Sequence, residues 1–179
     1  GTGPKAGGPN YLPRFTRRSS PLEDQEVGKA ADPKRVATAL SDAGGSREGP
    51  SRLMPGPTGE LNRLFTHQRP PILCLGPGQA ALRGQVAAVE SLGGRAVSVE
   101  DRLAPKALVT LPSFGAVIWW GGESLARDYA LALAEREGPI VPLVTGTPDL
   151  GHVMFERHLC VDTTAAGGNA SLLAGDVQG

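Results

Sequence analysis

The chain has 179 residues and carries 18 basic and 18 acidic side chains. This balance gives no reason to expect nucleic acid or an anionic membrane as a partner. Two cysteines are too few for a disulfide framework. We find no apolar run of the roughly 18–20 residues that a membrane span needs and no secretory signal, so a cytoplasmic location is expected.

The first third of the chain predicts arms and linkers with one short helix. Residues 1–18, "GTGPKAGGPNYLPRFTRR", hold too many glycines and prolines for a helix or a central strand. Residues 19–31 have the composition of a linker. Asp32 followed by Pro33 is typical of a helix start, and Gly44-Gly45 would end that helix after Ala43. The next stretch, 44–60, is rich in Gly, Pro and Ser and is predicted as loop.

From residue 71 onward, apolar runs alternate with amphipathic runs. This alternation predicts βαβ units, and thus an α/β fold with a Rossmann-like, mostly parallel sheet, helices on both faces and extended arms on either side. Pro142 within one of the strands indicates a sheet edge or a strand end. Residues 103–111 fit a helix or a strand. The predicted strands are 71–75, 95–99, 116–120, 140–144 and 158–163, and the predicted helices are 79–92 and 123–137.

Spacing also assigns side chains to faces. In the helix 79–92, the residues expected to face the core are Leu82, Val86, Val89 and Leu92. In the helix 123–137, the inward residues are Leu125, Tyr129, Ala132 and Leu133, and the outward ones are Arg127, Asp128, Glu135, Arg136 and Glu137. Strand alternation sends Trp119 and Trp120 to opposite faces of the sheet, either as core or with one ring at an interface.

The stretch "LCLGPGQAAL" at 73–82 is a good match to the G-x-G-x-x-G/A turn that holds a dinucleotide pyrophosphate. Gly76 and Gly78 would form the turn, and Glu100, after the next strand, could hold a ribose hydroxyl. However, Pro77 lacks a backbone N–H of the kind that cradles phosphate. Any tight turn from a strand into a helix also favours glycine.

No catalytic or metal-binding pattern stands out. Cys74 and Cys160 lie in strand-like apolar runs and are expected to be small core residues without reactivity. The three histidines, His67, His152 and His158, lack metal-ligand spacing, and no G-x-S-x-G elbow accompanies them. We therefore predict no catalytic residue and no metal site.

Both ends of the chain resemble one known family. "GTGPKAGGPNYLPRF" resembles the closing stretch of the aldehyde dehydrogenase module in the proline utilization A family, and "VDTTAAGGNASLLA" resembles the motif at the extreme C-terminus of its longer members. The middle stretches "PGPTGELNRLFTHQRPPILCLGPG", "AVIWWGGE" and "GPIVPLV" are similar to the domain between them. The resemblance covers nearly the whole chain except the 19–52 region.

The resemblance implies a role within a larger enzyme. Such proteins oxidise proline with FAD, then oxidise glutamate semialdehyde to glutamate with NAD, and a tunnel joins the two sites. The chain would comprise the end of the dehydrogenase module (1–18), a linker with a short helix (19–52), a Rossmann-like domain without ligand (53–157), and a C-terminal strand with a tunnel-sealing motif (158–179). The residues expected to dock and seal are Thr163, Thr164, Gly167, Gly168, Asn169, Ser171 and Leu172.

On this interpretation the chain is a non-catalytic lid that binds no cofactor itself. Its partner is the dehydrogenase module of the same polypeptide, and a homo-oligomer is left open. This part would not contact nucleic acid, and any membrane association of the parent would go through its flavin domain. The alternative is an independent Rossmann-type module that binds a nucleotide through Gly76, Gly78 and Glu100.

Overall fold

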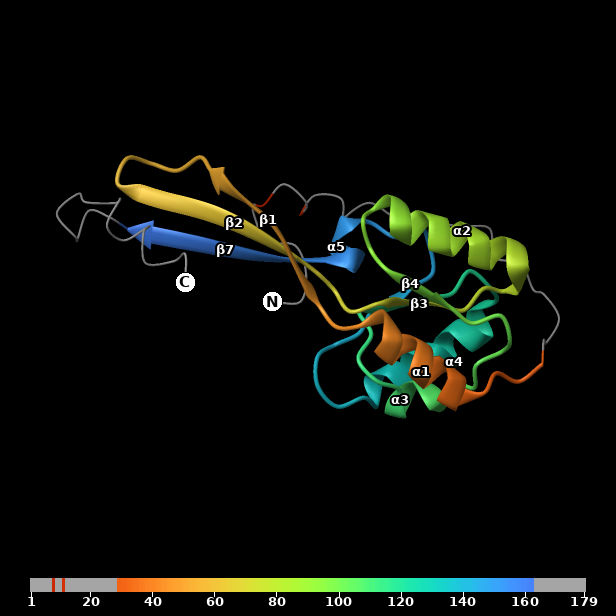
Figure 1. Ribbon diagram of the computed structural model, residues 1–179. Coiled ribbons are helices and arrows are strands. Elements are labelled where there is room, and N and C mark those ends of the chain that lie inside the picture. Colours follow the sequence, from red (N-terminus) through yellow and green to blue (C-terminus); the bar gives the residue numbers. More distant parts are fainter. Residues whose placement is uncertain (1–7, 9–10, 12–28, 163–179) are drawn as a thin grey trace.

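The structure, a computed structural model, describes Gly8, Tyr11 and residues 29–162. Within these residues the chain forms an α/β domain from which a long antiparallel arm projects (Figure 1). The predicted α/β class is therefore confirmed. The predicted extended segments at 1–18 and from residue 163 onward lie outside the described residues, apart from Gly8 and Tyr11. No described helix is long and apolar enough to cross a membrane.

A four-stranded parallel sheet forms the centre of the domain, in the order β4-β3-β5-β6. Four of the five predicted strands correspond to it, although each is shorter than predicted. Pro142 immediately precedes β6, which is the edge strand. This position suits proline because proline has no N–H to donate to a neighbouring strand. The strands are β3 (Ile72–Cys74), β4 (Ala96–Ser98), β5 (Ala116–Ile118) and β6 (Leu143–Val144).

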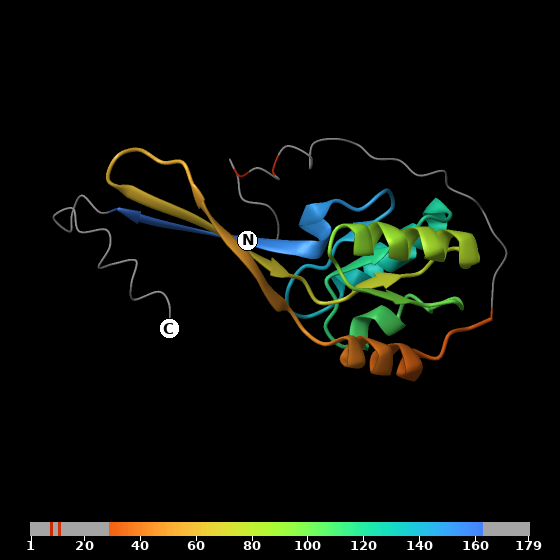
Figure 2. The same cartoon turned by 45° about the horizontal axis from the view of Figure 1, so that its top comes forward.

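Helices cover both faces of this sheet, as the alternating sequence pattern predicts (Figure 2). Leu73 and Val117 pack with α1, α3 and α4, whereas Ile72 and Ile118 pack with α2 and α5. The ambiguous stretch 103–111 contains a short helix, α3. The helices are α1 (Pro33–Ala43), α2 (Gly78–Ser91), α3 (Ala107–Thr110), α4 (Glu123–Ala134) and α5 (Leu150–Val153).

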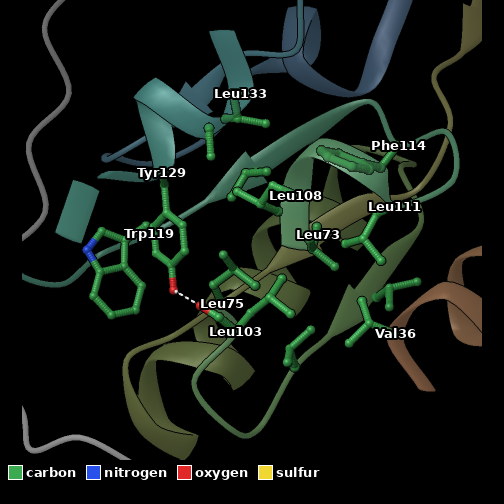
Figure 3. Close-up of a cluster of buried hydrophobic side chains, with 14 of the residues drawn as sticks. Val36, Leu73, Leu75, Leu103, Leu108, Leu111, Phe114, Trp119, Tyr129 and Leu133 are labelled. Atoms are coloured by element: carbon green, nitrogen blue, oxygen red, sulfur yellow. Dashed lines mark hydrogen bonds between the residues drawn. The ribbon is translucent and has the colours of Figure 1, made fainter. Parts of the chain in front are cut away.

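The larger of the two cores contains the main aromatic contact of the domain (Figure 3). Trp119 and Tyr129 meet edge to face with ring centroids 5.5 Å apart. The Tyr129 hydroxyl donates to the Leu103 carbonyl at 3.0 Å. Trp120 instead packs against the smaller core on the opposite face. The prediction that the two tryptophans diverge is thus confirmed.

The arm is a three-stranded antiparallel sheet in the order β1-β2-β7. Most of this sheet was not predicted from the sequence. Its strands are β1 (Arg47–Met54), β2 (Glu60–Gln68) and β7 (Met154–Asp162). The predicted loop over 44–60 is wrong because β1 occupies most of it. Pro50 is accommodated there by an irregular register between Glu48 and Ser51, on the outer strand of the sheet. The last predicted strand exists but belongs to this arm. Two predicted segment boundaries, at residues 53 and 158, fall inside β1 and β7.

Arginine side chains secure the loops around the domain, and one of them contradicts its predicted position. Arg136 is half-buried rather than outward, and its guanidinium lies 4.4 Å from the Phe114 ring centroid. The long aliphatic stem lets a charged residue bury its body while the head reaches backbone carbonyls. Arg95 similarly donates to the carbonyl of Gly44, beyond the end of α1.

Candidate functional site

The glycine-rich turn lies where the sequence places it, between β3 and α2 at the carboxyl end of the parallel sheet. In the sheet β3 lies between β4 and β5. The chain passes from β3 to β4 on one side and then returns across β3 to β5 on the other side, so the order of the strands reverses at β3. Such a switch point is where open α/β sheets bind their ligands. The turn is therefore the first candidate site in the described part of the chain.

Glycine is required at two positions of this turn. Gly76 has a φ of 86° and Gly78 a φ of 72°, which side-chain-bearing residues rarely adopt. A Cβ atom on Gly76 would also lie 2.8 Å from the Gly78 nitrogen. The backbone geometry alone therefore accounts for both glycines.

A buried side-chain amide that the sequence analysis missed forms hydrogen bonds with backbone groups of the turn. Gln85 of α2 is completely buried; its side-chain oxygen accepts from the Gly76 N–H at 3.0 Å, and its side-chain nitrogen donates to the Gly76 carbonyl at 2.7 Å. The N–H of Trp120 donates to the same carbonyl at 2.9 Å. Since Pro77 has no N–H, neither Gly76 nor Pro77 can donate to a phosphate. The signal for Gln85 was its spacing of three and four residues from Leu82 and Val89 on the buried face of α2.

The indole of Trp120 lies beside this turn and spans two elements. Its Nε1–H donates to the Gly146 carbonyl, after β6, at 2.9 Å. Its ring lies against α2, so that a Cβ atom on Gly84 would come within 3.0 Å of it. The side chain therefore links α2 to the segment that follows β6. Taken together, the turn does not fit a pyrophosphate-binding loop at its first two residues.

Glu100 is exposed beyond the end of β4, next to two hollows of about 310 and 380 Å³. One hollow lies toward α1 and includes Arg35; the other lies toward α2 and includes Gln79 and Arg83. The structure thus brings Glu100 and the first turn of α2 to one hollow. The N-terminus of α2 has no side-chain cap, which is the feature that best fits the nucleotide alternative.

Neither cysteine has the environment of a nucleophile. Burial, with a smaller contribution from Glu90, raises the pKa of Cys74 to about 12. Cys160 is exposed rather than a core residue, which corrects the prediction for it. Desolvation and the nearby carboxylate of Glu60 raise the pKa of its thiol. Both thiols are therefore protonated near neutral pH, whereas a catalytic cysteine needs a thiolate.

The histidines do not come together. His67 and His158 lie on the arm, and the register places them on opposite faces of its sheet. His152 lies in α5, where its Nδ1 is 2.8 Å from a carboxylate oxygen of Asp149 and accepts the Asp149 N–H at 3.1 Å. Among residues 29–162 no group of three His, Cys, Asp or Glu side chains could hold a metal ion.

One face of the arm carries a set of apolar side chains that we call the apolar strip. Strand register and alternation place its members on the same face, together with Arg63 and Arg157. Leu53 is 64% exposed, and the other members are half-buried. The strip consists of Leu53, Leu61, Phe65, Leu159 and Val161. The sequence analysis missed this face because β1 was predicted as loop and no strand was predicted at the position of β2.

The predicted sealing residues from Thr163 to Leu172 lie outside the described residues. The structure therefore shows only the strand that leads to them, β7, which ends at Asp162. β7 runs along the arm away from the domain (Figure 1).

Comparison with known proteins gives consistent matches along the sequence. The chain is 31% identical to the bifunctional protein PutA of Salmonella typhimurium and 30% identical to that of Escherichia coli, in each case over 97% of the chain. A further relative, the bifunctional protein PutA of Rhizobium meliloti, is 29% identical. The chain spans only 17% of the length of the first two relatives. No family model matches the chain.

Matches among solved structures cover less of the chain. A mutant of proline utilization A (PutA) from Bradyrhizobium japonicum is 26% identical with a TM-score of 0.43, over 60% of this chain and 14% of that one. A structure of proline utilization A with proline bound in remote sites matches with the same identity and TM-score, over 61% of this chain and 14% of that one.

Proposed function

Because the chain belongs to the family of bifunctional PutA proteins, we propose that it forms the C-terminal part of a proline-catabolic enzyme of this kind. The parent would oxidise proline with FAD and the resulting glutamate semialdehyde with NAD, in the cytoplasm. This chain would supply neither catalytic group nor cofactor site. Its role would be that of a lid, which docks on the dehydrogenase module and closes the path between the two active sites.

The apolar strip of the arm is the observation that carries this proposal. Apolar side chains that gather on one face without being fully buried commonly mark a surface that another surface covers; in the strip Leu53 is exposed and the other members are half-buried. Arg63 and Arg157 lie on the same face, and arginine next to apolar side chains is typical of protein interfaces. The occupant we propose is the dehydrogenase module of the same polypeptide, since the relatives extend far beyond the length of this chain.

The chemistry of the described residues supports a non-catalytic role. Aldehyde oxidation needs a thiolate nucleophile and a carboxylate that activates water. Cys74 is buried with a raised pKa, and Cys160 has Glu60, a carboxylate that disfavours a second negative charge, beside it. We propose that Thr163, Thr164, Gly167, Gly168, Asn169, Ser171 and Leu172 complete the docking.

Deleting residues 161–173 from the full-length parent tests the lid role. We expect conversion of proline to glutamate to fall, because the intermediate would escape or the dehydrogenase module would lose its support. Aldehyde oxidation from added semialdehyde, measured in parallel, separates these two causes. If the deletion leaves both rates unchanged, the proposal is wrong.

A nucleotide-binding role is the second candidate, and the uncapped N-terminus of α2 beside the Glu100 hollow favours it. Calorimetry with NAD, NADP and FAD on the 179-residue chain distinguishes the two. The lid proposal predicts no binding in the micromolar range. Micromolar binding that Gly78→Val abolishes would instead establish a nucleotide site.

A further inference from the structure

A cavity of about 250 Å³ lies at the neck of the molecule, where the arm joins the domain. The segments that precede β3, β5 and β6 meet there with the start of β7. This is the amino end of the parallel strands, whereas the glycine turn lies at their carboxyl end. We call this cavity the neck pocket. The lining residues on which the argument depends are Arg69, Phe114, Arg136, Ile140 and Phe155.

Two guanidinium groups stack on two phenyl rings in the walls of the neck pocket. Arg69 lies 4.2 Å from the Phe155 ring centroid, and Arg136 lies 4.4 Å from that of Phe114. Stacking on an aromatic face fixes the plane of a guanidinium and leaves it weakly hydrated. The pocket therefore combines positive charge with rigid apolar walls.

Arg136 has no carboxylate partner among the described residues, although it is half-buried. Its terminal nitrogens donate to the carbonyls of Leu108, Val109, Leu111 and Pro112, whereas its Nε–H has no partner in the described part of the chain. Desolvation lowers the pKa of this arginine. A cation withdrawn from water without an anion is stabilised when an anion arrives.

The size and lining of the pocket limit what this anion can be. Its volume is below the ~300–1,000 Å³ typical of pockets for drug-sized ligands, so the ligand must be small. Ile140 on the rim is 79% exposed and offers an apolar surface. The exposed carboxylate of Glu137 also lines the pocket and disfavours a ligand with several negative charges. We propose that the neck pocket binds a small organic monocarboxylate, with its carboxylate at Arg136 and its apolar body against Ile140 and Phe155.

Benzoate is a suitable probe because it pairs a carboxylate with a flat apolar body, and benzyl alcohol is its uncharged control. Both are titrated into the ¹⁵N-labelled 179-residue chain while amide shifts are followed. We expect benzoate to shift the amides of Ser113, Phe114 and Gly115, and to bind at least tenfold more tightly than benzyl alcohol, a ratio that corresponds to about 1.4 kcal/mol. Equal shifts with both probes, or no shift with benzoate, would overturn the proposal.

Two substitutions locate the site without relying on the arginine that also supports the fold. Ile140→Ser should weaken benzoate binding several-fold, because it removes apolar contact at the rim. Leu131→Ser is the matched control, since Leu131 is comparably exposed, at 61%, and does not line the pocket. The same loss of affinity in both variants, or in neither, contradicts the proposed location.

Discussion

At the scale of single residues, a buried glutamine accounts for the backbone hydrogen bonds at the start of the glycine turn. The side chain of Gln85 accepts the N–H of Gly76 and donates to the Gly76 carbonyl. The same carbonyl also accepts the N–H of Trp120. Hydrogen bonds of this kind keep buried backbone groups from being left unpaired. The Gly76 N–H is therefore taken up within the protein, whereas the N-terminus of α2 that follows has no side-chain cap.

Replacing this amide gives the first prediction. Gln85→Leu leaves the Gly76 N–H without its partner, which should lower the free energy of unfolding by ~1–3 kcal/mol. Chemical denaturation of the chain measures this difference. The control is Gln79→Leu, which changes the same residue type at an exposed position in the same helix. Equal stabilities of the two variants would show that the hydrogen bonds between Gln85 and Gly76 contribute nothing to the free energy of unfolding.

The second prediction concerns alkaline pH. Burial raises the pKa of Tyr129 to about 12 from the ordinary value of 10.0. Between these values the unfolded phenol loses its proton while the folded one keeps it, so the unfolded state binds fewer protons and stability must fall as pH rises. Tyr129→Phe should make the stability curve between pH 10 and 12 flatter than that of the parent chain. An unchanged slope in Tyr129→Phe would be the contrary result.

The third prediction separates the two thiols. With a thiol reagent at pH 8, Cys160 of the native chain should react first because it is exposed, whereas Cys74 should react only as fast as the chain unfolds. Cys160→Ser and Cys74→Ser assign each phase of the reaction. Rapid modification of Cys74 in native Cys160→Ser would contradict its burial.

At the scale of elements, the clearest local signals in the sequence are those of α1. Asp32 precedes Pro33, and its carboxylate accepts the Lys34 N–H at 2.9 Å, as expected of an N-cap. Gly44 ends the helix with a φ of 77°. These interactions join residues close in sequence, which is why the sequence alone sufficed to predict them.

The fourth prediction follows from the two ends of that helix. Asp32→Ala should lower the free energy of unfolding by about 1 kcal/mol, because it removes the cap. Asp42→Ala, at the other end, should leave stability unchanged or raise it slightly, since an acidic side chain opposes the dipole at a helix C-terminus. Denaturation curves of both variants test this, and a larger loss for Asp42→Ala would be inconsistent with the account.

The strands of the arm show where sequence reasoning failed. β1 contains Gly49 and Pro50 and only two large apolar residues, a composition that favours loop, yet β2 pairs with it along most of its length. Tertiary pairing here overrides local preference. The contacts of Gln85 and Arg136 were missed for a related reason: each depends on backbone groups that only the folded chain brings near.

At the scale of the whole molecule, the parallel sheet and its two helical layers could be predicted because short apolar runs alternate with amphipathic ones. The second sheet could not, because β1 has the composition of a loop and because the third strand is distant in sequence: β7 begins 86 residues after the end of β2, counted from Gln68 to Met154. The arm projects from the domain (Figure 1), and the apolar strip lies on one of its faces. The lid proposal depends on this projection.

The proposed docking of the apolar strip is tested most directly by trapping the aldehyde intermediate during proline oxidation in the full-length parent. Leu53→Gln changes the most exposed member of the strip. Arg52→Gln is the control, because Arg52 is the neighbouring residue, is also exposed and lies on the opposite face of the sheet. An aldehyde trap in the bulk solution reports how much intermediate escapes before the second oxidation. We predict more trapped aldehyde in Leu53→Gln than in Arg52→Gln, with equal rates of proline oxidation. Equal trapping in both variants and the unmodified parent would contradict the docking of the strip.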